Sequence, residues 1–355
     1  MPSSHTGSRA DDAAPPEPGW RRIRRWARRA TALLLTALVS AGTLVLAPVA
    51  YAGPGSTCTS NCVTTYDTPP TAAGEGPFGI VRGPLHSQWF TYGDAVARID
   101  DSGTLTRYPL PTAGAITRWM TSDNHGRVWF TEFGKIGWIT VDGDGNTLLR
   151  EYALPYEDAG IISLVLAPNH RAYFSEQALG KIGSIDIRTG AYREYDLPSS
   201  DPLGLTLGPD GALWYTDRAN AKVGRITLDG RVREWSLPPT ANLQRIVTGP
   251  DRALWFTDLR GNTLWRITTG GTISPYPMPG GPVGISVGGD RQLYLTLFTD
   301  GDLVRVDLHG NTTGRWDLPG ATFALQNAPG RGYDVWATDN RGHVYRVRTR
   351  TPATR

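Results

Sequence analysis

Five acidic residues recur at one place in a repeated sequence pattern, and they are the first candidates for chemistry. Each directly follows a strand-like segment that contains an aromatic residue, and they are Glu132, Glu176, Asp217, Asp258 and Asp339. A ring of carboxylates can hold a cation, and we take Glu132, Glu176, Asp217 and Asp258 as candidate metal ligands. Their regular recurrence favours a second role, in which they accept hydrogen bonds from backbone amides of a neighbouring loop.

Two pairs of residues break the repeated pattern. Arg118-Trp119 and Gln244-Arg245 break it in the first strand, where the position of Trp119 and Arg245 holds glycine, alanine or serine in the other repeats. Two arginines and a tryptophan around one channel could bind an anionic or aromatic ligand. In the alternative, the arginines neutralise the acidic ring and Trp119 fills the axis. The candidate ligand-binding residues are Arg118, Trp119, Gln244, Arg245, Phe78 and Phe323.

The six histidines form no pair with the spacing of metal ligands. We expect one in the N-terminal leader, three in turns between first and second strands, and two on the surface: His5, then His86, His125 and His170, then His309 and His343. The two cysteines, Cys58 and Cys62, are expected to form a small disulfide loop, with free or intermolecular thiols as the alternative.

The elements that position these residues form seven repeats. An aromatic residue marks the second strand of each, at steps of 39 to 44 residues: Trp89, Trp129, Tyr173, Trp214, Trp255, Tyr294 and Trp336. A second aromatic series marks the outermost strands: Tyr66, Tyr108, Tyr152, Tyr195, Trp235, Tyr276 and Trp316. The period near 40, the turn signals and the absence of helical periodicity predict an all-β fold, a seven-bladed β-propeller with four-stranded blades.

The two series are out of phase at the ends of the chain. The last repeat stops after its third strand, at Val344–Val347, while Val63–Asp67 is an outer strand without a repeat of its own. We therefore predict that the N-terminal strand completes the last blade and closes the ring. The propeller should span residues 63–348, with a tail at 349–355, and the first strand of each blade should line the central channel.

The first 52 residues resemble a bacterial export signal. A basic segment precedes the apolar run Thr31–Val45, and Ala50-Tyr51-Ala52 fits a cleavage site. Cleavage at this point, by the general or twin-arginine route, predicts a secreted protein without a membrane span, and an uncleaved anchor is the alternative. The segment 53–62 then carries the cysteines. Seven of the 36 basic and three of the 33 acidic residues lie in 1–52, which leaves 29 against 30. A nearly neutral mature chain gives no case for nucleic-acid binding, and we expect a monomer.

The repeat motifs resemble those of the streptogramin B lyase (virginiamycin B lyase) family. They are Gly-Pro-Asp-Gly-x-Leu-Trp-Tyr-Thr near Gly208, Lys-Val-Gly-Arg-Ile at Lys222–Ile226, and Glu-Tyr-x-Leu-Pro at Glu151–Pro155. The resemblance covers residues 64–348 and implies a seven-bladed propeller. It also implies ring opening of a cyclic depsipeptide antibiotic by elimination, assisted by Mg²⁺.

The family's acid-base residues have no counterpart in this sequence. Aligned on the repeats, the positions of the family's first-strand histidines hold Phe78, Arg118, Ile162, Leu203, Gln244, Val283 and Phe323, and its glutamate falls on Ala321. Three hypotheses follow. The first is a secreted propeller that binds a small molecule, peptide or partner at the channel mouth. The second is a divergent lyase whose base is a carboxylate such as Glu132 or Glu176. The third is an interaction module that uses the blade edges.

Overall fold

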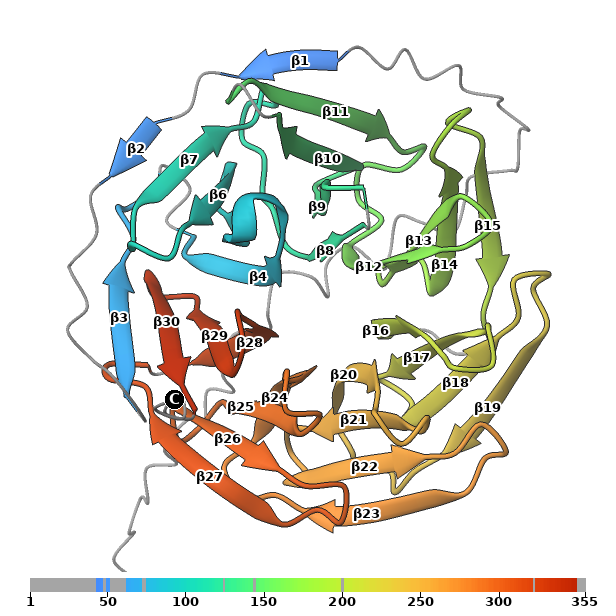
Figure 1. Ribbon diagram of the computed structural model, residues 1–355. Helices are drawn as coiled ribbons and strands as arrows, with labels where there is room; N and C mark the ends of the chain where they lie inside the picture. Colours follow the sequence, from blue (N-terminus) through green and yellow to red (C-terminus); the bar gives the residue numbers. More distant parts are fainter. Residues whose placement is uncertain are drawn as a thin grey trace, which may run out of the picture. The chain divides into compact units, whose positions relative to one another are not determined.

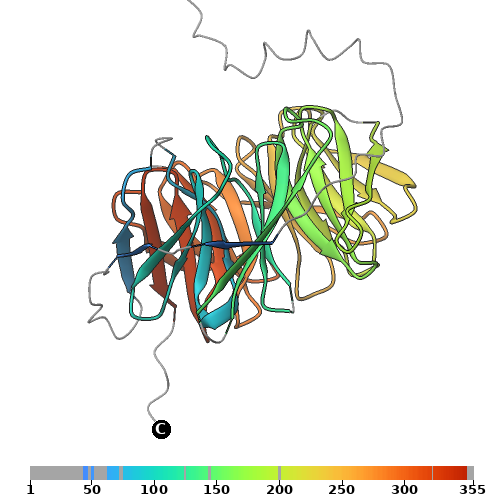
Figure 2. The same cartoon turned by 90° about the horizontal axis from the view of Figure 1, so that it is seen from above.

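The computed structural model describes residues 62–71, 75–123, 125–142, 145–198, 201–321 and 323–349, together with the backbone of 43–46 and 49–51. The strands form seven antiparallel sheets arranged in a ring (Figure 1). In the orthogonal view of Figure 2 the strands run between the two faces of this ring. The predicted seven-bladed β-propeller is confirmed. No helix of the described residues is long and apolar enough to cross a membrane.

The blades follow one another along the chain, each with its first strand innermost. Blade 1 consists of β4 (Pro77–Arg82), β5 (Gln88–Tyr92), β6 (Ala95–Ile99) and β7 (Leu105–Pro109), with the short 3₁₀ helix η3 (Pro84–His86) between β4 and β5. Blade 2 consists of β8 (Met120–Ser122), β9 (Val128–Glu132), β10 (Lys135–Val141) and β11 (Thr147–Ala153). Blade 3 consists of β12 (Ile161–Ala167), β13 (Arg171–Glu176), β14 (Lys181–Asp186) and β15 (Tyr192–Asp196).

Blade 4 consists of β16 (Pro202–Leu207), β17 (Leu213–Asp217), β18 (Lys222–Ile226) and β19 (Val232–Ser236). Blade 5 consists of β20 (Leu243–Thr248), β21 (Leu254–Asp258), β22 (Thr263–Ile267) and β23 (Ile273–Pro277). Blade 6 consists of β24 (Pro282–Val287), β25 (Leu293–Leu297), β26 (Asp302–Val306) and β27 (Thr312–Asp317). Blade 7 consists of β28 (Ala324–Pro329), β29 (Asp334–Asp339), β30 (His343–Arg348) and β3 (Val63–Asp67).

Ring closure by the N-terminal strand is also confirmed. β3 pairs antiparallel with β30, so that Val63 lies opposite Val347 and Asp67 opposite His343. Just beyond the strand, both the backbone N–H and the Oγ1 of Thr68 donate hydrogen bonds to the carbonyl oxygen of Gly342, at 2.7 and 2.8 Å. The open edge of the last sheet is thus covered by a segment from the other end of the chain.

Two further short strands lie outside the predicted propeller. The backbones of β1 (Thr43–Leu46) and β2 (Val49–Tyr51) pair with the outer strands β11 and β7, as fifth strands of blades 2 and 1. Both fall within the segment that the sequence predicts to be an export leader. The rest of 1–52 lies outside the described residues, and the leader stays a prediction.

The two aromatic series of the sequence meet within each blade. The second-strand ring packs on the ring of the outermost strand in all seven blades: Trp89 on Tyr108, Trp129 on Tyr152, Tyr173 on Tyr195, Trp214 on Trp235, Trp255 on Tyr276, Tyr294 on Trp316 and Trp336 on Tyr66. The Trp214 and Trp235 centroids, for example, are 5.2 Å apart with planes 10° from parallel. In each blade, the stacked rings span the third strand and connect the second strand to the outermost strand.

Hydroxyl groups on the second strands join neighbouring blades near the axis. Thr216 accepts a hydrogen bond from the N–H of Gly204 in its own blade (2.9 Å) and donates one to the carbonyl of Gln244 in the next (2.7 Å). Thr91 and Thr257 make the same pair of contacts from blades 1 and 5. Because these hydroxyls are buried, each lost bond would leave polar backbone groups unsatisfied.

Glycine on the inner strands reflects the crowding expected near the axis. A Cβ added at Gly204 would lie 2.7 Å from the carbonyl oxygen of Gln244, and one at Gly284 would lie 2.6 Å from that of Leu325. Both contacts are with the backbone of the next blade, which cannot move independently of its sheet. The inner strands can therefore approach one another only where a side chain is absent.

Candidate functional site

Strand register defines one equivalent first-strand residue in each blade. Each immediately precedes the residue that pairs with the one following the second-strand aromatic, and these residues, called the axial ring below, are Gly79, Trp119, Ser163, Gly204, Arg245, Gly284 and Gln326. The hairpins between second and third strands and the connections between blades lie on one face, which we call the top face. Trp119 and Arg245 are the bulky members of the ring, as their departure from the sequence pattern indicated.

The register also corrects the sequence alignment in blade 7. The residue that precedes the axial ring there is Leu325, because Gln326 pairs with Thr338 and Asn327 with Ala337. Leu325, and not Phe323, is thus the residue aligned with the family's first-strand histidine. Phe323 falls at the position of the family's glutamate, to which the sequence alignment had assigned Ala321. An irregularity in the pairing between Ala324 and Gln326 shifts this strand relative to a simple count from the turn.

Arg118 is held at the channel mouth by a carboxylate. Its Nη1 and Nη2 lie 2.9 and 3.2 Å from the two carboxylate oxygens of Glu75, which form a bidentate ion pair. Its guanidinium carbon also lies 5.6 Å from the centroid of the Phe78 ring. About a third of each charged side chain remains exposed, at 29% for Arg118 and 34% for Glu75. The pair is therefore accessible from solvent.

Arg245 reaches across the axis from blade 5. Its guanidinium carbon lies 4.4 Å from the centroid of the Trp119 ring in blade 2 and 5.9 Å from that of Phe78 in blade 1. Its Nη1 lies 3.4 Å from the Ser163 hydroxyl in blade 3. The side chain is 5% exposed, and burial lowers its pKa to about 9, with the nearby charge of Arg218 contributing. Four blades thus contribute to one cationic and aromatic cluster, which we call the axial cluster: Phe78, Arg118, Trp119 and Arg245, with Ser163 beneath.

Gln244 and Phe323 make separate contacts. The Gln244 amide donates a hydrogen bond of 2.7 Å to the side-chain oxygen of Asn242, the residue just before β20. The Phe323 ring packs at 4.8 Å on that of Phe298, and the Arg341 guanidinium carbon lies 4.9 Å from its centroid. Phe323 and Arg341 therefore form a second aromatic and cationic contact in blade 7, and no contact in the described residues joins it to the axial cluster.

Three of the recurring acids bind loop backbone. Asp217 accepts from the N–H of Asn220 at 2.9 Å, and Asp258 accepts from the N–H groups of Asn242 and Gly261, both at 2.8 Å. Asp339 accepts from the N–H groups of Arg341 and His343 at 3.0 and 2.9 Å. This is the structural role that recurrence favoured, in which each carboxylate fixes the hairpin after its own second strand.

Glu132 and Glu176 differ from these aspartates. Glu132 accepts a hydrogen bond from Thr112 Oγ1 (3.2 Å) and lies 3.4 Å from Lys135 Nζ, while Glu176 accepts one from the Tyr192 hydroxyl (2.7 Å). In each, the second carboxylate oxygen is buried without a hydrogen-bond partner. Burial, together with the neighbouring carboxylates Glu151 and Glu194, raises the pKa of both groups to about 7. A carboxyl that titrates near neutrality can exchange a proton at physiological pH.

The recurring acids do not fit the Mg²⁺ that the family resemblance implies. Each carboxylate is buried in its own blade with local partners, whereas Mg²⁺ requires several oxygen ligands converging on one point. Within the ranges described above, no group of three His, Cys, Asp or Glu side chains could hold a metal ion. These residues therefore provide no basis for a metal-assisted step.

His343 is the histidine whose environment the sequence did not foresee. It lies at the first position of β30, where blades 2 to 4 carry Lys135, Lys181 and Lys222. Its Nδ1 lies 2.7 Å from the buried carboxylate of Asp339, and its side chain is 27% exposed. His343 is thus partly exposed at the start of its strand, as expected, but its pairing with a buried acid was not foreseen. The signal lay in the pattern itself, since this histidine replaces the lysine that pairs with an acid in other blades.

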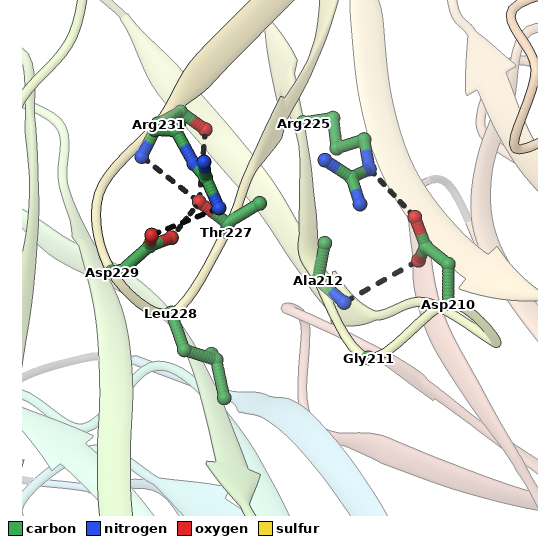
Figure 3. Close-up of a pocket in the computed structure, with 8 residues that line it drawn as sticks. All are labelled: Asp210, Gly211, Ala212, Arg225, Thr227, Leu228, Asp229 and Arg231. Carbon is green, nitrogen blue, oxygen red and sulfur yellow. Dashed lines mark hydrogen bonds and ion pairs between the residues drawn. The ribbon is translucent and has the colours of Figure 1, made fainter.

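A surface pocket lies on the opposite face of blade 4 and contains none of the candidate residues. Figure 3 shows its lining, from the turn at Asp210–Ala212, the hairpin at Thr227–Arg231 and Arg225. The volume of the pocket is about 350 Å³. Arg225 is already paired with Asp210 at 2.6 Å, and Arg231 with Asp229 at 3.0 Å. Because its charges are neutralised locally, this shallow pocket offers little to a ligand, and the axial cluster remains the candidate site.

Sequence reasoning missed three contributors to this site. Glu75 pairs with Arg118, Ser163 contacts Arg245, and Gln326 completes the axial ring. The missed threonines of the blade junctions had a visible signal, because a hydroxyl residue stands at the same second-strand position in every blade: Thr91, Thr131, Ser175, Thr216, Thr257, Thr296 and Thr338.

The fold and site define a class: a seven-bladed, four-stranded β-propeller with a cationic and aromatic cluster at the mouth of its channel. Residues 134–350 match the model of the Virginiamycin B lyase family. The chain therefore belongs to the virginiamycin B lyase family.

Solved structures agree with this assignment. Selenomethionine-substituted virginiamycin B lyase from Staphylococcus aureus is 29% identical, with a TM-score of 0.73 over 81% of this chain and 99% of that one. A catalytically inactive histidine-to-alanine variant of the Staphylococcus aureus enzyme with quinupristin is 30% identical, with a TM-score of 0.72 and the same coverage. A streptogramin B lyase is 29% identical, with a TM-score of 0.72 over 80% and 97% of the two chains. A comparison with curated proteins gave no significant match.

Proposed function

We propose that this family member binds a small ligand at the top of its axial channel and does not open a depsipeptide ring by the histidine-dependent route. The observation that carries the proposal is the axial cluster itself. Phe78, Arg118, Trp119 and Arg245 come from three blades. The Arg118 guanidinium lies 5.6 Å from the Phe78 ring, and that of Arg245 lies 4.4 Å from the Trp119 ring and 5.9 Å from the Phe78 ring. Phe78 and Trp119 remain half-buried, so that aromatic surface is available beside charge.

The top face adds further apolar surface for such a ligand. Phe133 and Tyr156 are 55% and 44% exposed, in the hairpin of blade 2 and in the connection that follows it. These two segments touch, because the N–H of Leu154 donates a hydrogen bond to the carbonyl of Gly134. Exposed aromatic residues at such a rim commonly contribute to recognition.

The residues that occupy the positions of the family's histidines support a role without histidine-dependent ring opening. The quinupristin-bound relative is inactive after a histidine-to-alanine change, so that enzyme depends on a histidine. In this chain, the residues that precede the axial ring in the last two blades are Val283 and Leu325. Neither can transfer a proton, and a two-residue shift of alignment brings no imidazole to either position.

The test combines binding with product analysis. Purified protein is incubated with quinupristin and Mg²⁺ and followed by chromatography with mass spectrometry, because elimination opens the ring without changing the mass. We expect binding by calorimetry and no linear product, and we expect Phe78→Ala and Arg118→Ala to weaken binding. A linear product that disappears with EDTA would overturn the proposal. Phe133→Ala tests the contribution of the rim to binding separately from that of the axial cluster. Leu85→Ala, which changes an exposed residue of η3 on the opposite face, is the matched control.

A second candidate function is a divergent lyase that uses Glu132 or Glu176 as the base. It is favoured by the pKa of about 7 of each carboxyl and by the unpartnered oxygen of each. Because the side chains are 2% and 0% exposed, substrate access would require the adjacent hairpin to open. In this case Glu132→Gln or Glu176→Gln would abolish turnover and leave quinupristin affinity unchanged, whereas either variant with full turnover would exclude that glutamate as the base.

We further propose that the chain is exported and that Cys58 pairs with Cys62. The support is the order of the basic segment, apolar run and Ala50-Tyr51-Ala52, and the short spacing of the two cysteines. Cys58 lies outside the described residues. Intact mass analysis of protein recovered from the medium tests both points. A mature chain beginning at Gly53, with a mass increase only after reduction and alkylation, is the expected result, and a full-length cell-bound chain would contradict it.

A further inference from the structure

Arg245 is a buried cation whose charge is not matched by a nearby acid. Its Nε is buried without a hydrogen-bond partner, and its Nη1 has only the long 3.4 Å contact with Ser163 Oγ. No carboxylate in the described part of the chain forms an ion pair with it. Arg118 and Arg218, the other arginines near the channel mouth, are paired with Glu75 and Asp201. The unpaired charge of Arg245 is therefore a specific feature of blade 5.

Burying such a group is costly, and it cannot escape the cost by losing its proton. An unpaired guanidinium in a region of low dielectric loses its hydration without a compensating partner. Although burial and Arg218 lower its pKa to about 9, Arg245 is still protonated at neutral pH. Stacking on the Trp119 face recovers part of the lost hydration. The rest of the charge is available to attract an anion.

A second buried donor stands in the same ring. Gln326 occupies the equivalent position in blade 7, is 3% exposed, and its Nε2 is buried without an acceptor. Both unsatisfied groups are hydrogen-bond donors, so each would be satisfied by an acceptor oxygen of a ligand. Three other members of the axial ring, Gly79, Gly204 and Gly284, have no side chain and contribute no donor of this kind.

From these contacts we propose that the axial cluster binds the carboxylate of an organic ligand, with Arg245 as its cationic anchor and Gln326 as a second donor. This inference rests on the proposed function, because it names the chemical class of the ligand for the same site. Carboxylate matches the planar fork of the guanidinium and can take two parallel hydrogen bonds. The flanking Trp119 and Phe78 rings favour a carboxylate that carries an aromatic or apolar group. A free inorganic anion would use the same donors without the aromatic faces.

The experiment uses the purified protein with acetate, phenylacetate, phenylacetamide and chloride at constant ionic strength, followed by equilibrium dialysis with radiolabelled phenylacetate. We expect phenylacetate to bind with a stoichiometry of one and more tightly than acetate, and phenylacetamide to bind weakly. Arg245→Met removes the charge but keeps an apolar side chain against Trp119. It should lower the affinity for phenylacetate at least about tenfold. Gln326→Leu should weaken it less. Arg225→Met, which removes a guanidinium paired with Asp210 on the opposite face, is the matched control and should leave the affinity for phenylacetate unchanged.

The outcomes separate this inference from the proposed function. Phenylacetate binding that is unchanged by Arg245→Met and Gln326→Leu, or binding of phenylacetamide equal to that of phenylacetate, overturns the carboxylate assignment. Displacement by chloride at equal concentration, with no preference for phenylacetate over acetate, overturns the organic ligand in favour of an inorganic anion. If quinupristin binds through Phe78 while none of the carboxylates binds, the proposed function stands and this inference fails. Circular dichroism of each variant confirms that it is folded.

Discussion

The hydroxyl of Thr338 in the last blade donates a hydrogen bond of 2.6 Å to the carbonyl oxygen of Phe78 in the first. The two residues are 260 positions apart in the chain, so this bond joins the ends of the ring at the axis. It repeats the threonine contact that connects successive blades elsewhere. At the rim, β3 closes the same junction by pairing with β30. Blade 7 is therefore attached to blade 1 at both the inner and the outer edge.

Thr338→Val tests the inner contact. Valine keeps the shape of threonine but leaves the buried carbonyl of Phe78 without its donor, and we expect a loss of about 1–2 kcal/mol in the free energy of unfolding. Thr216→Val, at an internal junction, should have a similar effect. The control is Thr272→Val, whose side chain is exposed and should change stability by less than about 0.5 kcal/mol. Urea denaturation measures all three, and equal stabilities for Thr338→Val and Thr272→Val would contradict the role of the hydroxyl.

Removing β3 tests the outer contact. Deletion of residues 1–67 leaves the β30 edge unpaired and removes Tyr66 from its stack on Trp336. We expect a lower melting temperature and self-association through the exposed edge, measured by calorimetry and light scattering. Deletion of residues 1–52 is the control, since it keeps β3 and should give a monomer of full stability if this segment is a cleaved leader. A stable monomer after the longer deletion would exclude closure by β3 as a source of stability.

The buried glutamates predict a particular dependence of stability on pH. An exposed glutamate ionises near 4.5, whereas Glu132 and Glu176 retain protons in the folded protein up to about 7. The folded state thus binds more protons than the unfolded state between these values, so its stability falls as the pH rises through this window. From pH 5 to 8 we expect a loss on the order of 2 kcal/mol for each of the two carboxyls.

Amide variants identify the source of this slope. Glu132→Gln and Glu176→Gln imitate the protonated carboxyl and should flatten the decline, most clearly in the double variant. Glu157→Gln, at an exposed position, should leave it unchanged. The measurement is the urea midpoint at several pH values. A wild-type curve that rises between pH 5 and 8, or a slope unaffected by the double variant, would show that these carboxyls are ionised throughout.

Arg245 should reduce the stability of the ligand-free protein. Because its charge is buried without an acid, we expect Arg245→Met to raise the free energy of unfolding by about 1–3 kcal/mol. Arg118→Met breaks a pair that is about one-third exposed and should change stability by less than about 1 kcal/mol. Thermal denaturation in phosphate-free buffer of low salt compares the two. A strong destabilisation by Arg245→Met would indicate that packing on Trp119 outweighs the cost of the charge.

Much of the architecture could be predicted because each blade repeats the same short-range signals. The two aromatic series of the sequence are the rings that stack in each blade, and Tyr66, in the segment left over at the N-terminus, stacks on Trp336 as the phase difference required. Strand pairing within a blade is local, and repetition averages out the uncertainty of any single turn. Blade number and ring closure therefore followed from counting.

The site depends on contacts between distant blades, and these are not encoded in the repeat. Arg245 was recognised as a departure from the pattern, but its position over Trp119 depends on the side-chain length and on the diameter of the ring. The irregular pairing after Ala324 moved the aligned residue from Phe323 to Leu325, which no count from the turn could show. Glu75 lies just before β4, outside the strands whose register the repeat pattern predicts.

Because β3 pairs with β30, the last blade can be completed only after nearly the whole chain has been synthesised. The strand that completes blade 7 is made before any blade, while its partner is added only when almost the whole chain has left the ribosome. Until then Val63–Asp67 has no native neighbour, and six blades can assemble without it. Closure of the ring must therefore be the final folding event.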